Sequence, residues 1–405
     1  MAKMDRKKVL VTYGWNRIAY IILRSLAIKG IDVFVGDSSR LAMSRMSKYC
    51  KGFIRYPSFY EDPKGFVTSI IDFCRKNKIG IYFPVHEETF IAAKFIDLFK
   101  ESDIIVPVVD FDKLVKVHRK DSVIKYAESL GIPVPKTFVP KDFYEAKELL
   151  EICRYPLVIK QINTNSAKGV FYAHSKEGAL KILEKIEKSE RDGNRKVPPI
   201  LQEYVTGSGY GVSLLFNRGK LRAIFTHKRL REKTFTGGTS TLRVGTINPI
   251  IEEYAINLLE SLQWHGVAMV EFKFNEARKK AWLIEVNPRF WGSLALPVAS
   301  GVDFPYLLYK IAAEGDVQPL SRYETGIRAR WILGDILAVI DEIKNTRNPF
   351  KAFLNFFRFN NDIYDDLWKD DLYPFVFEFF YYAGKFIRTG STNPVKSALL
   401  EVDKL

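Results

Sequence analysis

The segment 266–291 contains the residues whose types and spacing suggest chemistry most directly. Apolar and polar residues alternate in two runs, and a turn centred near Arg278 would place Glu271 and Glu285 directly opposite each other on adjacent strands. Like charges in that position repel and destabilise a sheet unless a cation lies between them. Because carboxylates and the Asn287 amide are hard oxygen ligands, the pattern predicts a Mg²⁺ site.

Alternation also assigns the neighbours of these residues to faces. The predicted core face of the first strand is apolar throughout: Ala268, Val270, Phe272 and Phe274. In the second strand, strict alternation groups Leu283 with Glu285 and Asn287, and Pro288 then ends the strand. The alternative interpretation is that Glu271 and Glu285 are solvated on an exposed face of the sheet.

Two segments earlier in the chain offer positive charge to a phosphate group. Lys160 ends the apolar run 155–160, where a lysine either reaches the surface or projects into a cleft. The small polar loop 163–169, which contains Lys168 and Gly169, could offer amides, hydroxyls and one ammonium group to a polyphosphate, although ordinary turns look similar. The chain has no G-x-x-x-x-G-K-[ST] motif, so this loop is not a P-loop.

Two further segments could complete a nucleotide site. Residues 202–205 end a strand, and backbone groups there could pair with the edge of an adenine ring. Residues 226–232, with His227 and Arg229, gather cations that could neutralise a phosphoryl group or hold a carboxylate. A basic strand end followed by a flexible loop at 236–240 explains this pattern equally well.

These candidates need elements to position them, and the first hundred residues alternate strands with helices. The predicted strands are 9–12, 31–35, 79–83 and 104–107, and the predicted helices are 17–29, 66–77 and 88–100. This alternation is typical of a parallel sheet with crossover helices. The first turn holds only Gly14, so it lacks the glycine fingerprint of a dinucleotide site.

The middle of the chain has an α+β pattern with antiparallel strands. We predict helices at 113–130, 178–190 and 250–262, and strands at 155–161, 170–174, 200–205, 212–216 and 221–228, besides the acidic hairpin. A glycine-rich turn is expected at 207–211. From about Ile332 onward the chain is helical and unusually aromatic.

Composition excludes several classes of protein. The 405 residues are 47% hydrophobic and 27% charged, which is typical of a globular protein and not of a disordered chain. The net charge of +15 invites a nucleic-acid partner, but no nucleic-acid-binding motif is present. The three cysteines lack paired metal-ligand spacing, and no signal peptide or apolar run of ~20 residues occurs. We expect a cytoplasmic protein that binds no nucleic acid.

In this order, the elements between about residues 9 and 316 resemble the ATP-grasp superfamily of carboxylate ligases. The segment 285–289 is the strongest match, and 227–232 and 290–294 resemble a subgroup of carboxylate–amine ligases related to carbamoyl-phosphate synthase and D-alanine–D-alanine ligase. The resemblance implies an α/β and α+β protein with the ATP-grasp fold. Its parts would be a Rossmann-like domain at 1–111, an ATP-grasp domain at 112–331 with a lid at about 151–205, and a helical extension at 332–405.

The resemblance also implies roles for single residues. The residues implied at ATP are Lys120, Lys160, Lys168, Gly169, Gln202, Glu203 and Val205, of which Glu203 and Val205 would receive adenine on their backbones. Glu271 and Glu285 would bridge two Mg²⁺ (or Mn²⁺) ions, with Asn287 on the second. The residues implied near the transferred phosphoryl group are His227, Arg229 and Arg289.

The reaction that the resemblance implies joins a small-molecule carboxylate to an amine through an acyl phosphate, with release of ADP and phosphate. Two departures from related ligases stand out: residues 208–210 lack an acid for the ribose, and Met269 stands where some relatives carry arginine. A non-catalytic nucleotide-binding or regulatory protein on the same fold is the alternative. We expect substrate contacts from 13–17, 84–88, Arg289 and Trp291.

The aromatic tail has three interpretations. Residues 350–358 and 375–387 are dense in Phe and Tyr, with Lys and Arg between them. They could form a peripheral membrane contact, a homodimer interface, or a helical pair packed on the rest of the protein. We favour the packed helical pair.

Overall fold

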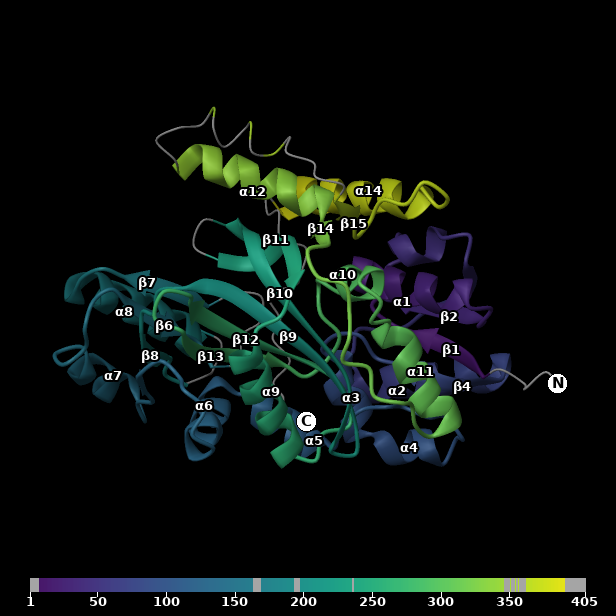
Figure 1. Cartoon of the computed structure of the whole chain (residues 1–405), viewed down its shortest axis with the longest axis horizontal. Helices are drawn as coiled ribbons and strands as arrows, with labels where there is room; N and C mark the ends of the chain where they lie inside the picture. The colour runs from purple at the N-terminus through teal and green to yellow at the C-terminus, as the bar shows by residue number, and fades with distance from the viewer. Residues whose placement is uncertain are drawn as a thin grey trace.

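A computed structural model describes residues 7–162, 169–192, 197–234, 237–345 and 362–389, together with residues 350, 354 and 356. Three sheets organise the described chain. In Figure 1 a large sheet lies between an N-terminal α/β region on the right and a small lid on the left, with helices α12 and α14 above.

The N-terminal region contains the expected parallel sheet. Its strand order is β3-β2-β1-β4, with β1 (Lys8–Val11), β2 (Val33–Asp37), β3 (Cys50–Arg55) and β4 (Ile79–Phe83). Its helices are α1 (Arg17–Ile28), η1 (Met43–Met46), α2 (Pro63–Asn77), α3 (Glu88–Lys94) and α4 (Ile96–Lys100). Asn16 begins α1 because its side chain accepts a hydrogen bond from the Ile18 N–H.

Three details of this region differ from the sequence prediction. Strand β3 was not expected, and the predicted strand at 104–107 forms only a single bridge between Ile105 and Ile81. The predicted helix at 88–100 is interrupted at Phe95, which separates α3 from α4.

The region expected as a lid at about 151–205 belongs to a small antiparallel sheet with helices packed against it, and we call this sheet with its helices the lid. Its order is β5-β8-β6-β7, with β5 (Thr137–Phe138), β6 (Leu157–Lys160), β7 (Val170–Ala173) and β8 (Ile200–Glu203). Helices α7 (Phe143–Leu149) and α8 (Lys176–Asp192) share its apolar core. The helix predicted at 113–130 is in fact α5 (Phe111–His118) followed by α6 (Lys120–Ser129), because Arg119 has an extended backbone.

The large sheet carries the acidic hairpin. Its order is β13-β12-β9-β10-β11-β14-β15, with β9 (Ser208–Asn217), β10 (Lys220–Thr234), β11 (Gly237–Thr246), β12 (Gly266–Asn275), β13 (Lys280–Asn287), β14 (Arg328–Arg330) and β15 (Ile363–Tyr364). Helices α9 (Pro249–Ser261), α10 (Ala295–Ala299) and α11 (Phe304–Glu314) accompany it. Two predictions were wrong here. Most of the turn expected at 207–211 belongs to β9, and most of the loop expected at 236–240 belongs to β11.

A β-bulge at Ile284 sets the two faces of the hairpin. Glu271 pairs with Glu285, whereas the next residue, Phe272, pairs with Leu283. Leu283 therefore joins Phe272 in the core, while Glu285 stays beside Glu271 on the other face. The grouping of Leu283 with Glu285 by strict alternation was wrong, because the bulge reverses the alternation between them.

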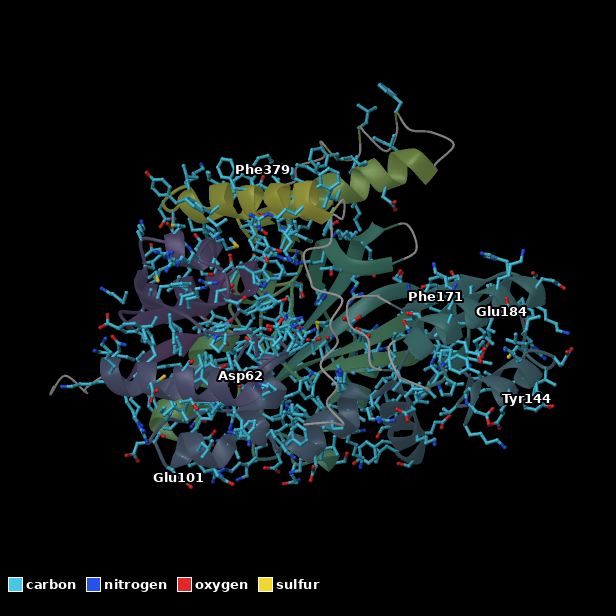
Figure 2. The ribbon with its side chains drawn as sticks, turned by 180° about the vertical axis from the view of Figure 1, so that it is seen from behind. Asp62, Glu101, Tyr144, Phe171, Glu184 and Phe379 are labelled. Atoms are coloured by element: carbon cyan, nitrogen blue, oxygen red, sulfur yellow. The ribbon has the colours of Figure 1, made fainter. Side chains whose placement is uncertain are left out.

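The described part of the tail packs on the rest of the protein. Helices α12 (Ile332–Asn345) and α14 (Tyr373–Thr389) lie over the upper edge of the large sheet in Figure 1. The ring of Tyr381 stacks on Trp15 with 5.1 Å between centroids, and Tyr382 contacts Trp331. On the outer side, Phe379 is 53% exposed and points away from the protein (Figure 2).

These contacts agree with the packed helical pair that we favoured. Among helices in the described ranges, none has the length and apolar character of a membrane span. Most of 350–358 lies outside the described residues.

Candidate functional site

Glu271 and Glu285 are brought together with Asn287 at the end of the acidic hairpin. The two glutamates are paired in register across β12 and β13. The Asn287 Nδ2 group donates to Glu271 Oε1 at 3.1 Å and to Glu285 Oε1 at 3.4 Å. The Glu271 side chain is only 12% exposed, so it is not a solvated surface acid.

Burial and like charge act on Glu271. Loss of hydration raises the pKa of its carboxyl above the ordinary value, and the neighbouring charge of Glu285 raises it further. Arg229, from β10, opposes both effects, since its Nη2 lies 2.5 Å from Glu271 Oε2. Arg229 is the guanidinium group that forms an ion pair with this couple of carboxylates among the described residues, so further positive charge would stabilise Glu271 and Glu285.

The chemistry of these donors fits a divalent cation. Two carboxylates and an amide provide the oxygen ligands that Mg²⁺ or Mn²⁺ prefers. No group of three His, Cys, Asp or Glu side chains suited to a metal occurs in the described ranges, so the Asn287 amide would be needed as a ligand. Its Oδ1 accepts from Arg289 at 3.0 Å, and ligation through that oxygen would require the amide to turn over.

Two buried lysines bring positive charge to the same place. Burial lowers the pKa of Lys160 to about 8, although the charges of Glu285 and Glu271 oppose this shift. Burial also lowers the pKa of Lys120, again against the charge of Glu285. The Lys120 Nζ donates to the Ile162 carbonyl at 3.2 Å. Both ammonium groups therefore lie between the lid and the acidic hairpin.

The remaining residues that were predicted to contact ATP belong to the lid or directly follow it. Gln202 and Glu203 end β8, where the Glu203 N–H donates to the Lys136 carbonyl at 2.8 Å, and Val205 follows the strand. The Gly169 carbonyl accepts from the Gln161 N–H at 2.9 Å. Lys168 lies outside the described residues. The roles of these residues at ATP stay predictions.

His227 occupies a buried position on β10. Its ring lies over Gly211, where a Cβ atom would come within 2.4 Å of His227 Cε1, so only glycine fits. Burial and the neighbouring Arg229 and Arg243 lower the pKa of His227 well below its ordinary value, so the imidazole is neutral. Its Nε2 lies 3.4 Å from the Ser293 Oγ. His227 therefore adds no charge to the cationic cluster expected at 226–232.

Arg289 connects the hairpin to the N-terminal region. Besides Asn287, it contacts the Phe290 carbonyl at 2.8 Å. A small cavity lined in part by Pro84, Thr89 and Arg289 separates it from the loop after β4. The ring of His86 stacks on Tyr13 there, with 4.5 Å between centroids. Segments 13–17 and 84–88, expected to contact substrate, thus lie near Arg289.

The sequence analysis missed Arg243 and Ser293. Arg243, on β11, is fully buried and stands directly opposite Arg229. Ser293 follows the matched segment 285–289 and contacts His227. A buried arginine in a strand was the available signal for Arg243, but β11 itself was expected to begin as a loop.

Comparison with known proteins relates part of this chain to a family. Residues 195–334 match a family described as "ATP-grasp in the biosynthetic pathway with Ter operon". A D-alanine–D-alanine ligase of Fusobacterium nucleatum is 31% identical over 96 residues, 24% of this chain and 27% of that protein. A phosphoribosylamine–glycine ligase of Halalkalibacterium halodurans is 23% identical over 286 residues, 69% of this chain and 62% of that protein. The chain thus spans less than two thirds of each of these relatives.

Solved structures share the fold at low identity. A biotin carboxylase from Campylobacter jejuni, solved as a β,γ-ATP complex, matches with a TM-score of 0.66 at 15% identity, covering 79% of this chain and 74% of that one. An ADP complex of N5-carboxyaminoimidazole synthetase from Staphylococcus aureus matches with a TM-score of 0.62 at 16% identity, covering 81% and 82%. The fold of the described chain is therefore the fold that these nucleotide-bound proteins share.

Proposed function

We propose that the chain, whose residues 195–334 match an ATP-grasp family, is an ATP-dependent ligase of the ATP-grasp superfamily that joins a carboxylate to an amine. ATP would lie between the lid and the acidic hairpin, with its phosphates near Lys160 and Lys120. The substrates would be a small-molecule acid and a small-molecule amine. We place the reaction in the cytoplasm.

In the first step, an oxygen of the substrate carboxylate attacks the γ-phosphorus of ATP. A new O–P bond forms, the bond from the γ-phosphorus to the β,γ-bridging oxygen breaks, and ADP leaves. In the second step, the amine nitrogen attacks the carbonyl carbon of the acyl phosphate. The C–O bond to phosphate breaks, the nitrogen loses a proton, and an amide and inorganic phosphate remain.

The chain's own residues hold the anionic groups together. A carboxylate and a triphosphate repel each other, so cations must offset their charges before the oxygen can approach. Lys160 and Lys120 would bind phosphate oxygens, and Arg229 and Arg289 would face the transferred group. Held by Glu271, Glu285 and Asn287, Mg²⁺ or Mn²⁺ would neutralise phosphate oxygens and act as a Lewis acid.

The observation that carries the proposal is the register of the hairpin. Glu271 and Glu285 face the same side and share the Asn287 amide, and their charges act on Lys160 from the opposite sheet. A buried pair of carboxylates destabilises a fold unless cations compensate for it, and a metal ion would add to the charge that Arg229 and Lys160 already supply. This arrangement therefore supports a nucleotide–metal site and opposes the interpretation of two solvated acids.

Labelled substrates test the mechanism. The full chain would be incubated with ATP, Mg²⁺ and a panel of acids and amines, and with ¹⁸O in the carboxylate of each active acid. We expect ADP and phosphate as products, with ¹⁸O from the acid in the phosphate. AMP and pyrophosphate, or phosphate without ¹⁸O, would contradict the acyl phosphate. Nucleotide binding without turnover across the panel would favour the non-catalytic alternative.

A further inference from the structure

Two buried arginines beside the hairpin share one carboxylate. Arg17, which begins α1, and Arg243, on β11, are 4% and 0% exposed. The Arg17 Nε donates to Asp365 Oδ2 at 3.2 Å, and the Arg243 Nη2 donates to Asp365 Oδ1. Two guanidinium groups on one aspartate leave one positive charge without a counter-charge in this contact.

The same two side chains have unused hydrogen-bond donors. Arg17 Nη2 and Arg243 Nε and Nη1 are buried and lack a hydrogen-bond partner among the described residues. A buried charged donor without a partner is costly, and few native structures retain one without a ligand or water. Asp366 and Glu378 also face Arg17, and burial together with their neighbouring acidic charge raises the pKa of both carboxyls, while Arg17 opposes this shift.

A neighbouring arginine shows that the deficit is local. Arg330, on β14, is also fully buried, but its Nε and Nη2 contact Asp362 at 2.9 and 2.8 Å, and its Nη1 contacts Asp335 at 2.7 Å. All three nitrogens of that guanidinium are thus used. The unpaired donors of Arg17 and Arg243 are therefore a property of their own position.

That position adjoins the proposed reaction centre. Arg243 lies directly opposite Arg229, which contacts Glu271. On the other side, a Cβ atom on Gly292 would lie 2.8 Å from Arg17 Nη2. Gly292 is three positions after Arg289. Arg243 thus neighbours Arg229, and Arg17 neighbours the segment of Arg289, the two arginines that we propose near the transferred phosphoryl group.

We propose that Arg17 and Arg243 bind a carboxylate of the acid substrate and that Asp365 is the positioning residue that orients them. This inference rests on the proposed function and deepens it by assigning the acid to a site. The planar guanidinium fork suits the two oxygens of a carboxylate. Gly292 packs close to Arg17 Nη2, so a side chain at that position would displace the guanidinium group.

Acetate is the probe that tests this site. We would measure the melting temperature of the full chain without ATP, in sodium acetate, sodium phosphate or sodium chloride at equal ionic strength. We expect acetate to raise the melting temperature of the wild type by about 2–4 °C over chloride, which corresponds to occupancy well above its dissociation constant. Arg243→Gln should lose this shift.

A matched arginine provides the control. Arg222 forms an ion pair with Asp316 at 2.6 Å on the surface, away from the unpaired donors. Arg222→Gln should keep the full acetate shift. Gly292→Ala retains every charge but crowds Arg17 Nη2, so it should fold and lose the shift. If Arg243→Gln does not fold, Gly292→Ala and wild-type crystals soaked in acetate decide, with difference density expected between Arg17 and Arg243.

Several outcomes would overturn the assignment. Equal shifts in acetate and chloride, or acetate density elsewhere, would do so. A shift in phosphate but not in acetate would assign the arginines to a phosphate group instead. If ADP formation proceeds in Arg243→Gln with an unchanged KM for the acid, only this inference fails. If acetate binds as expected but no acid supports ADP formation, only the proposed function fails.

Discussion

Two regions of the large sheet, which meet at the Arg229–Arg243 pair, share their buried charged partners in opposite ways. On β12 and β13, Glu271 and Glu285 face each other with Arg229 as the direct ion-pair partner. On β11, Arg243 shares Asp365 with Arg17. In the first region two carboxylates share one directly bonded guanidinium group, and in the second two guanidinium groups share one directly bonded carboxylate.

On the proposed assignments, the difference is that the shared carboxylates take a cation and the shared arginines take an anion. Fully paired groups lie close by: Arg330 uses all three of its nitrogens on protein partners. The fold can thus satisfy every nitrogen of a buried guanidinium group with protein partners where no ligand is proposed. In the two regions compared, the proposed cation and carboxylate would supply the missing partners.

Removal of the shared carboxylate should give the largest effect. Asp365→Asn removes the carboxylate that Arg17 and Arg243 share, so we expect the free energy of unfolding to fall by about 3–5 kcal/mol. The measurement is guanidinium chloride unfolding. As a control, Asp316→Asn breaks an exposed pair with Arg222 and should cost about 1 kcal/mol or less. Similar costs for the two variants would remove the contrast between paired and shared arginines.

In the acidic hairpin, Glu285→Gln should lower the rate of ADP formation about 100-fold. Stability without Mg²⁺ should stay the same or rise, because the substitution removes a repulsion from Glu271. Steady-state rates and melting temperatures check both parts. Glu276→Gln, on the same hairpin but paired with Lys228, should keep the wild-type rate. An unchanged rate in Glu285→Gln would separate the hairpin from the chemistry.

The pH dependence of ATP binding sharpens the role of Lys160. Its pKa of about 8 lies below the ordinary value, so the ammonium group loses its proton as the pH rises through 8. We expect ATP affinity to fall about five- to tenfold between pH 7 and pH 9. Lys160→Arg should bind ATP equally at both values, since arginine stays charged. Calorimetry measures the ATP affinity of both proteins. An equal fall in affinity in the wild type and in Lys160→Arg would assign the titration to another group.

The smallest effect is expected at the outer face of α14. Phe379 is 53% exposed, so Phe379→Glu should change the free energy of unfolding by no more than about 0.5 kcal/mol. On the inner face, Tyr382→Phe removes only a hydroxyl and serves as a conservative comparison. Urea unfolding measures these changes. A large loss of unfolding free energy in Phe379→Glu would show that the outer face of α14 makes stabilising apolar contacts, in addition to the ion pairs of Asp365.

Local patterns predicted the pairing of the two glutamates in the acidic hairpin correctly. Alternation and turn length placed Glu271 opposite Glu285, because both strands belong to one hairpin and their register depends on a short turn. The parallel N-terminal sheet followed from strand–helix alternation in the same way. The bulge at Ile284 was not predictable, since the core accepts Leu283 only after the sheet has assembled.

The contacts of Arg17 and Arg243 with Asp365 could not be predicted, because they join distant parts of the chain. Arg243 and Asp365 are 122 positions apart. Strand β11 begins with Gly237 and Gly238, which weaken any strand signal, and it extends only because β10 offers it an edge. The sequence therefore showed a charged residue but not its partner. The domain boundaries at 111 and 331 stay predictions.

The contact between Arg17 and Asp365 spans 348 positions. During translation, the first helix leaves the ribosome long before the aspartate that its arginine needs. Contacts of such separation form late in folding. A nascent or prematurely terminated chain that stops before Asp365 carries the whole acidic hairpin, yet its acid-binding corner has no counter-ion. The Arg17–Arg243–Asp365 cluster can therefore form only after the tail has been synthesised. A chain truncated before Asp365 lacks the carboxylate that the two arginines share.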